Sequence, residues 1–209
     1  MGRHLALAIF LTFGAIAFGC ADPAADKPKA TVGGAAPEAP KTAGAETLTI
    51  TPENSKVGFH ASKVTGSHEG SFKQFNGKID LAPNNNIPQS SVSIDIDTAS
   101  VEADDPKLTA HLKTPDFFDV AKFPKASFVS TKIEPAGNTF NVTGNLDLHG
   151  VKKSITFPAN IQATDGSVSV DADFAINRKD FGIVYTGKSD DLIRDEVVMK
   201  LALKVPRTK

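Results

Sequence analysis

Residues 167–177 read SVSVDADFAIN, and this stretch decides the fold class. From Val168 to Ile176 every second position is apolar, and serine, aspartate or alanine stands between. Successive side chains of a β-strand point to opposite faces, so this period of two predicts a strand with one buried and one wet face. Strands covered by helices on both faces would be apolar throughout, so the pattern also predicts an antiparallel sheet.

The same alternation recurs in both directions from this stretch. Turn-forming residues separate the repeats, as at Asp165-Gly166 and at His149-Gly150, which is most simply a hairpin turn. Short strands at regular spacing predict an all-β fold, a closed antiparallel barrel or a sandwich of about eight strands. The predicted strands, of which the first is short, cover residues 47–51, 56–63, 70–81, 90–100, 126–134, 139–148, 152–163, 167–177 and 195–206.

One long connection, over residues 101–125, interrupts the strands. Asp105-Pro106 predicts a helix cap followed by a proline at the first helical position. The short helix that follows carries Leu108, His111 and Leu112 on one face. Beyond it the loop holds Phe117, Phe118 and Phe123. Exposed phenylalanines are unfavourable, so we expect this loop to cap or line something.

Residues 1–19 have the form of an export signal. Arg3 precedes a continuous apolar run over residues 5–18, which is too short to span a bilayer. The run ends beside Cys20 and resembles a bacterial lipobox, which predicts that Cys20 is acylated and anchors the protein to a membrane. An ordinary signal peptide cut nearby is the alternative. Ala21 in place of aspartate resembles an outer-membrane sorting signal, so we expect a periplasmic protein, on the outer membrane if the organism is Gram-negative.

Residues 20–46 are predicted to be the lipidated cysteine and a disordered tether. They consist mostly of alanine, proline, glycine and charged residues, and so cannot bury enough apolar area to offset the entropy of ordering. Residues 47–209 then form a single domain. The formal net charge of −1 gives no basic field for nucleic acid and no polybasic patch for a membrane.

The interior of the barrel can be used in two ways. A barrel of about eight strands either fills its inside with side chains or holds one small ligand. The chain has no tryptophan, one tyrosine and 14 phenylalanines. Phenylalanine therefore supplies most of the aromatic bulk, either as ordinary core or as the lining of an elongated apolar tunnel. Composition leaves both readings open.

Five blocks of sequence follow one another in the domain: SKVGF at 55–59 with GSFKQFNGKI at 70–79, IDIDTASV at 94–101, HLKTPDFFDVAKFP at 111–124, GNLDLHGVKK at 144–153 and NRKDFG at 177–182. In this order and at these spacings they resemble the YceI family of periplasmic, lipocalin-like polyisoprenoid-binding proteins. The resemblance runs from Leu48 to Val205, nearly the whole domain. No single block is decisive, but the ordered set is highly specific.

The resemblance implies an extended eight-stranded antiparallel barrel with a short helix in one long connection. It implies that the barrel holds a polyisoprenoid or isoprenoid quinone and no cofactor besides that lipid. The protein would then act as a carrier, store or sensor of the lipid. Homodimerisation is left open. Burial of a prenyl tail is favourable by about 25 cal/mol per Å² of apolar area, so binding needs no chemistry. The expected ligand-binding residues are His111, Asp116, Phe117, Phe118, Phe123, Phe72, Phe75, Arg178, Asp180 and Phe181.

One departure from the family concerns the head group of the ligand. The family often has an Arg-Asp pair shortly before the histidine, whereas residues 107–110 read KLTA. This difference favours a quinone or another neutral ligand over a pyrophosphate. His111 either hydrogen-bonds the loop or contacts the head group, and Arg178 and Asp180 either form a buried ion pair or contact the ligand.

Two other classes of function remain as alternatives. In the first, the protein is a structural or interaction lipoprotein of the envelope, whose barrel is only a core and whose loops bind a partner. An enzyme acting on a prenyl lipid would need a polar cluster at the tunnel mouth, from His111, Asp116, Arg178 and Asp180. The sequence has no Gly-x-Ser-x-Gly, phosphate-binding glycine loop or His-Glu-x-x-His, and no cluster of metal ligands surrounds His60 and His68. We therefore expect neither catalysis nor a metal site.

Overall fold

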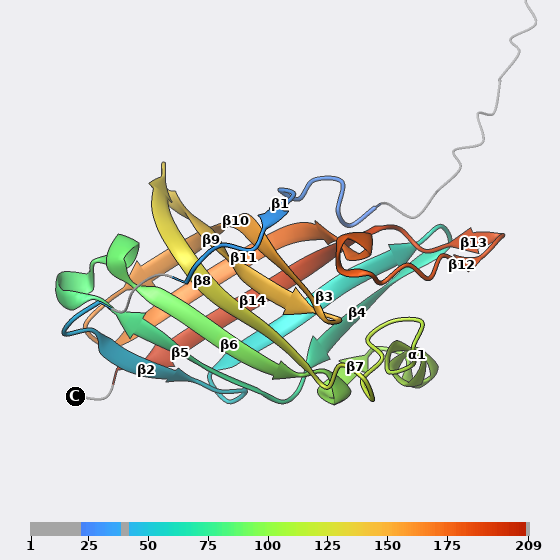
Figure 1. Cartoon of the computed structure of the whole chain (residues 1–209), viewed down its shortest axis with the longest axis horizontal. Coiled ribbons are helices and arrows are strands. Elements are labelled where there is room, and N and C mark those ends of the chain that lie inside the picture. Colours follow the sequence, from blue (N-terminus) through green and yellow to red (C-terminus); the bar gives the residue numbers. More distant parts are fainter. Residues whose placement is uncertain (1–21, 39–41, 208–209) are drawn as a thin grey trace, which may run out of the picture.

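The computed structural model describes residues 22–38 and 42–207, which form an elongated antiparallel β-barrel (Figure 1). One short α-helix, α1 (Pro106–Leu112), lies at one end of the part described. The long strands are β3 (Ser55–Lys63), β8 (Lys125–Ala136), β9 (Thr139–Leu148), β10 (Val151–Ala163), β11 (Ser167–Asn177) and β14 (Glu196–Pro206). The shorter ones are β1 (Thr31–Gly34), β2 (Glu46–Ile50), β4 (Gly66–Phe72), β5 (Phe75–Leu81), β6 (Ser91–Asp97), β7 (Val101–Ala103), β12 (Gly187–Lys188) and β13 (Asp191–Leu192).

Two bent strands close the sheet into a ring. The stretch predicted as one strand over residues 70–81 bends at Lys73-Gln74, so that β4 pairs with β3 and β7 while β5 pairs with β6 and β2. The 3₁₀ turn η3 (Thr98–Ser100) bends β6 into β7 in the same way. From β6 the antiparallel pairing continues through β8, β9, β10, β11 and β14 back to β3. Counting each bent pair once, the described chain has eight strands in the ring, and the predicted fold class is confirmed.

The alternation that decided the fold class points its apolar side chains inward. Val168, Ala172, Phe174 and Ile176 of β11 are all buried. They pack with residues of the facing strands in two apolar clusters, of which the first includes residues from both ends of the barrel. Phe157 of β10 and Phe174 of β11 stack at 4.0 Å between ring centroids in the second cluster. The interior is therefore a continuous apolar column, which is the frame of the candidate site.

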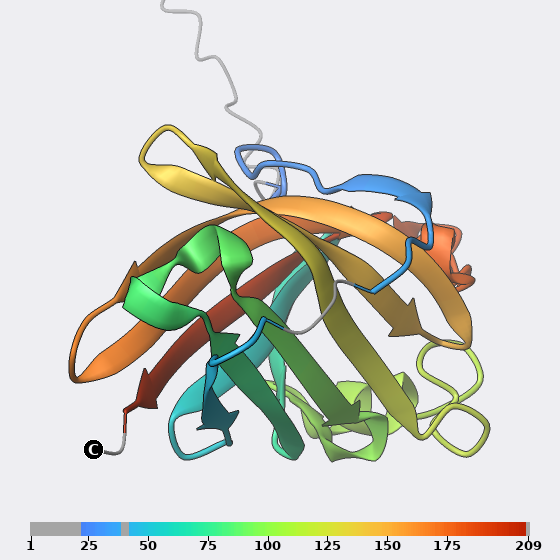
Figure 2. The ribbon, with the colours of Figure 1, turned by 60° about the vertical axis from the view of Figure 1, so that its left-hand side comes forward.

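The end of the barrel that carries α1 is the mouth end. The side chain of Asp105 accepts a hydrogen bond from the Leu108 amide at 2.9 Å, so the predicted cap and helix are confirmed. Beside α1 the β12–β13 hairpin projects from the barrel (Figure 1). At the opposite end lie the turns η1 (Pro83–Asn85) and η2 (Ile87–Gln89), shown in green in Figure 2, and the β10–β11 turn.

The prediction of a disordered tether is wrong for residues 22–38, which form an ordered strap against the barrel wall. Ala24 is fully buried against Ala175 and Val198. Further along, β1 pairs with β10 in the register Thr31↔Thr156. Composition misled because it counts only large apolar side chains, whereas backbone hydrogen bonds and small side chains hold the strap.

The strap fills a seam in the barrel wall. Pairing between β10 and β11 stops at Asn160↔Asp171, just short of Pro158, which has no N–H to donate. Beyond this point β10 and β11 no longer pair with each other, and each leaves an edge open to the strap. The strap lies between them, with β1 on the edge of β10 and the Pro28 carbonyl and Ala30 amide bonded to Ala175 of β11 at 2.9 and 2.8 Å. Pairing of open edges is a common way to satisfy backbone groups, and it explains why the strap is ordered here.

Residues 1–19 and Cys20, for which an export signal and acylation are predicted, lie outside the described residues. Within the described residues, no helix has both the length and the apolar character needed to cross a bilayer. The anchor and its membrane therefore remain predictions.

Candidate ligand-binding site

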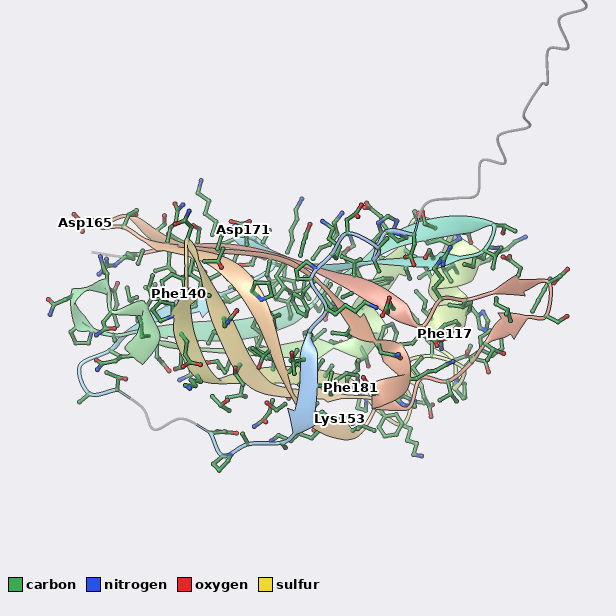
Figure 3. All side chains as sticks on the ribbon, turned by 90° about the horizontal axis from the view of Figure 1, so that it is seen from above. Phe117, Phe140, Lys153, Asp165, Asp171 and Phe181 are labelled. Carbon is green, nitrogen blue, oxygen red and sulfur yellow. The ribbon has the colours of Figure 1, made fainter. Side chains whose placement is uncertain are left out.

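A cavity of about 290 Å³, the mouth pocket, opens at the mouth end between α1, the end of β3 and the β12–β13 hairpin. Leu108, His111 and Leu112 line it from the helix, so the face predicted for that helix is the one turned to the pocket. Phe117 from the following loop lines it as well, and Figure 3 shows this side chain at the hairpin end of the molecule. The remaining lining residues are Phe59, Ala61, Ser62, Lys63, His68, Tyr185, Gly187, Lys188, Asp191 and Ile193.

Three rings meet edge to face in the mouth pocket. The His111 ring lies 4.9 Å from that of Phe117 and 5.3 Å from that of Tyr185, and the latter two are 5.5 Å apart. The Nε2 atom of His111 is 2.7 Å from Oδ2 of Asp116, so the loop carboxylate orients the imidazole. Such edge-to-face packing stabilises the rings beyond the area they bury. The structural role predicted for His111 is present, and the residue also lines the mouth pocket.

Ion pairs hold the polar wall of the mouth pocket. Asp191 of the hairpin accepts hydrogen bonds from Lys63 and from the hydroxyl of Thr65, and the bond from Lys63 is the main reason that the pKa of Asp191 lies below its usual range. His68 Nδ1 and Asp104 Oδ1 are 2.8 Å apart. Burial tends to raise the pKa of Asp104, but hydrogen bonds from the Glu69 amide and His68 outweigh it, so this pKa is lowered. The charge of Lys63 and the ring of His68 are thus each matched by a carboxylate.

Below the mouth pocket lies an apolar cavity of about 110 Å³, the inner chamber. Phe59, Ala61, Leu112, Phe117 and Ile193 line both cavities and form the neck between them. The rest of the chamber is lined by Phe72, Ile96, Phe118, Ala126, Leu146, Leu148, Ile176, Arg178, Ile183, Val197 and Met199. The mouth pocket, which has charged side chains on one wall, and the apolar chamber therefore adjoin at this neck, whose smallest side chain is Ala61.

Arg178 is the charged residue of the chamber wall, and its side chain is almost fully buried. Its Nη1 donates to the carbonyl of Ile183 at 2.7 Å and its Nε to that of Arg194 at 3.1 Å. Nη2 lies 3.4 Å from Oδ1 of Asp195. Burial lowers the pKa of the guanidinium, and the charge of Asp195 works against that shift. Its donors are thus engaged by the chain, and Arg178 ties the loop before the hairpin to the start of β14.

A far chamber of about 50 Å³ continues the apolar column beyond the inner one. Phe128 and Phe157 lie on its wall with aliphatic residues of β5, β6, β11 and β14. The Phe128 ring covers Gly144 on the neighbouring strand, where an added Cβ would stand 2.3 Å from the ring. This glycine therefore makes room for the aromatic lining.

The structure gathers some of the predicted site residues and separates others. Phe72, Phe117, Phe118 and Arg178 surround the inner chamber, and His111 with Asp116 stands at the mouth. Four others line none of the three cavities: Phe75, Phe123, Asp180 and Phe181.

These four residues have other partners. Phe75 is buried in the first apolar cluster and Phe181 in the second, and the ring of Phe123 packs on that of His149. Asp180 lies 3.7 Å from Lys153 and Arg178 pairs with Asp195, so the ion pair between Arg178 and Asp180, one of the two alternatives, is not the one that forms. The polar cluster proposed for an enzyme, made of His111, Asp116, Arg178 and Asp180, is therefore not assembled as a group.

Sequence reasoning missed the neck and the hairpin. Ala61 and Ile193 are small or ordinary aliphatic residues, and no local pattern marks them as a constriction. Tyr185 offered a signal, since it is the one tyrosine of the chain and stands three residues after the NRKDFG block.

The chain is similar in sequence to proteins of a known family. The profile of the YceI-like domain family matches residues 48–205. A UPF0312 protein of Pseudomonas putida is 35% identical over 134 residues, which cover 59% of this chain and 68% of that protein. Protein YceI of Salmonella arizonae is 33% identical over 120 residues, which cover 54% of this chain and 62% of that protein. The match thus spans less than two thirds of the Salmonella protein.

Solved structures show the same architecture. BcnA of Burkholderia cenocepacia superposes with a TM-score of 0.67 at 29% identity, over 76% of this chain and 99% of that one. A domain of Saccharophagus degradans, described as polyisoprenoid binding and implicated in plant cell wall breakdown, gives a TM-score of 0.62 at 17% identity over 78% and 99%. The second likeness bears on the fold alone. Because the family profile covers most of the sequence, this chain belongs to the YceI-like domain family.

Proposed function

We propose that the barrel binds a long apolar isoprenoid lipid, a quinone or a polyprenyl chain. The tail lies in the inner chamber and the head group lies in the mouth pocket. The observation that carries this proposal is the neck, where a pocket with charged side chains on one wall adjoins an apolar chamber within one barrel. An amphiphile with one small polar end and one long apolar end matches that order. The description of the Saccharophagus domain as polyisoprenoid binding supports the ligand class.

The energetics need no catalytic chemistry. A prenyl tail is insoluble in water, and its burial contributes about 25 cal/mol per Å² of apolar area removed from water. The side chains of the chamber supply apolar surface, and the donors of Arg178 are already engaged by carbonyls of Ile183 and Arg194. Hydrocarbon therefore enters without leaving a buried polar group unpaired.

The proposal places this lipid-binding domain in the envelope. Residues 1–19 act as the export signal and Cys20 carries the acyl anchor, which puts the protein in the periplasm, on the outer membrane of a Gram-negative organism. There it serves as carrier, store or sensor of the lipid. The apolar run and the lone cysteine of the chain support this part of the proposal.

The test is native mass spectrometry with organic extraction of the protein purified from its own host. We expect a co-purifying species of prenyl-length mass. Ala61→Phe blocks the neck and removes that species, whereas Ala202→Phe makes the same change at an exposed position of β14 and leaves it bound. The same spectra report whether the protein is a monomer or a homodimer.

A barrel that serves only as a core is the second candidate. The volumes favour it, because the inner chamber of about 110 Å³ and the far chamber of about 50 Å³ are below the roughly 300–1,000 Å³ typical of ligand pockets. A lipid tail would have to displace side chains to occupy both. A protein that stays free of lipid after incubation with quinones and prenyl phosphates would support an envelope lipoprotein whose loops bind a partner.

A further inference from the structure

Three large apolar side chains stand exposed at the mouth end: Val64, Val184 and Leu192, with exposed fractions of 55%, 62% and 49%. They are the exposed large apolar residues of the described chain. Val64 lies in the β3–β4 turn, where its amide donates to the carbonyl of Leu192 in β13 at 3.1 Å. Val184 lies in the segment that leads into β12. We call these three residues the apolar rim.

The apolar rim lies at the same end of the barrel as the mouth pocket. Each of its members is the neighbour in sequence of a residue that lines the pocket: Lys63, Tyr185 and Ile193. An exposed group of large apolar residues on a monomer commonly marks a contact with a protein or a membrane. Its place at the end of the barrel that holds the mouth pocket favours a partner from which an apolar ligand passes into the barrel.

The strap fixes where the chain leaves this surface. Asp22 lies 3.3 Å from Arg194, between the hairpin and β14, and its carboxylate accepts a hydrogen bond from the Ala24 amide at 2.9 Å. Fully buried Ala24 holds the next turn of chain on the wall. The first described residue is therefore anchored at the mouth end, beside the hairpin that carries Leu192.

Chain length then limits the distance of Cys20 from the apolar rim. Only Ala21 stands between Cys20 and Asp22, and each of the two steps covers at most about 3.6 Å of extended chain, so the two Cα atoms can lie no more than about 7 Å apart. Acyl chains on Cys20 would enter a bilayer at this point. The apolar rim would lie next to the bilayer, whereas Asp165 would be at the far end of the barrel (Figure 3).

From these two observations we propose that the apolar rim is a bilayer-docking surface, which the strap turns toward the membrane that holds the lipid anchor. The apolar rim contacts the lipid bilayer itself and not another protein. Lys63 is paired with Asp191 beside it, so apolar contact and the covalent anchor, rather than net charge, carry the docking. The mouth pocket then opens onto the lipid surface. This proposal rests on the proposed function for its anchor, and it adds the orientation in which lipid is taken up.

The experiment uses the full-length chain, purified from its host in detergent and reconstituted into vesicles of phosphatidylethanolamine and phosphatidylglycerol. A fluorophore is attached to Ser189→Cys in the hairpin turn or to Asp165→Cys at the far end, both exposed positions. Lipids with a nitroxide on the acyl chain quench a fluorophore that approaches the bilayer. We expect quenching to be several-fold stronger at residue 189 than at residue 165, and to fall when Val184→Asp and Leu192→Asp are combined.

A matched pair of insertions tests the strap. A flexible Gly-Ser linker inserted between Ala21 and Asp22 keeps the anchor but frees the orientation, so the difference between the two positions disappears. The same linker inserted after Glu38 lies beyond the strap and preserves the difference. Equal quenching at both positions of the parent chain, or no effect of the first linker, would overturn the proposal.

A separate measurement shows whether Cys20 carries the acyl anchor. Cys20 is the one cysteine of the chain, so the parent protein does not react with a maleimide if Cys20 is acylated. Reaction with maleimide overturns the docking proposal at its first step. Lipid extraction of the same preparation reports on isoprenoid binding independently, so loss of the docking proposal and loss of the proposed ligand are distinguished.

Discussion

Asn145 on β9 pairs with Ala36 of the strap as a neighbouring strand would. Its side-chain amide donates to the Ala36 carbonyl at 2.7 Å, and its side-chain oxygen accepts from the Ala36 amide at 2.9 Å. Asn145 itself is 2% exposed. One buried side chain thus satisfies both main-chain groups of a strap residue and fixes the strap beyond the end of β1.

Asn145→Ala removes both of these hydrogen bonds. At about 1 kcal/mol for each bond, the strap is destabilised by about 2 kcal/mol. Amide hydrogen exchange over residues 29–36 should therefore accelerate while β11 and β14 stay protected. Asn141→Ala on the same strand, at an exposed position, is the control and should leave the exchange unchanged. Unchanged protection of the strap in the Asn145 variant would show that β1 alone holds it.

Arg178 and Lys179 are adjacent residues with opposite environments. Arg178→Met leaves the carbonyls of Ile183 and Arg194 without their donor in a buried site, and we expect a loss of about 3 kcal/mol in the free energy of unfolding. Lys179→Met breaks an ion pair with Asp195 whose partners are both more than a third exposed, so its effect should stay below about 1 kcal/mol. Urea unfolding of the two variants gives the comparison, and equal losses would contradict the structural role assigned to Arg178.

Acid should release the hairpin from the β3–β4 turn. The pKa of Asp191 is lowered by its hydrogen bonds with Lys63 and Thr65. A lowered carboxyl pKa means that the contact stabilises the fold above the ordinary value of about 3.9 and is lost as the pH falls through the lowered pKa. Exchange of the amides in β12 and β13, corrected for its intrinsic pH dependence, should therefore rise relative to β14 below about pH 4.

Asp191→Asn is the control for this pH dependence. It should exchange faster in the hairpin already at neutral pH and show little further change in acid. If the variant kept the parent pH profile, the release would have to come from other carboxylates of the mouth end. Asp104 and Glu69 are the candidates, because the pKa of each is also lowered.

The sequence predicted those parts of the fold that depend on neighbours along the chain. The period of two gave the strands, Asp105 gave the helix cap, and His149-Gly150 forms the two-residue turn between β9 and β10. Both turn residues have positive φ, 54° and 74°, as a tight hairpin requires. Each of these features is decided by local backbone preference and by which face is apolar.

The strap could not be predicted from composition, because its partner is a distant defect in the sheet. The ladder between β10 and β11 ends near Pro158, and only the folded barrel shows that two edges are left open there. The stretch KATV at 29–32 does alternate, and Ala30 and Val32 pack on the second apolar cluster. A four-residue alternation is nevertheless too short to identify a strand without its partner.

Apart from Phe72 and Arg178, the candidate site was predicted where its residues come from one loop and missed where distant residues converge. His111, Asp116, Phe117 and Phe118 lie close in sequence and meet at the mouth and chamber. Ala61, Tyr185 and Ile193 come from separate strands and loops. Their proximity depends on the closure of the barrel, which a pattern of apolar residues does not encode.

His111 offers a direct test of head-group recognition. His111→Phe preserves a ring against Phe117 and Tyr185 but removes the bond to Asp116 and any bond to a ligand. If the imidazole contacts the head group, loss of one hydrogen bond of about 1.4 kcal/mol weakens quinone binding about tenfold. Squalene, a prenyl hydrocarbon without a head group, should bind equally to both proteins.

Titration of each protein with a fluorescent competitor in the barrel gives both affinities. A tenfold loss for the quinone with unchanged squalene binding assigns His111 to the head group. Equal losses for the two ligands would mean that His111 acts by positioning Phe117 in the neck, since only the shape of the passage is then disturbed. Asp116→Asn separates the two roles further, because it keeps the loop side chain and its size while changing the partner that orients the imidazole.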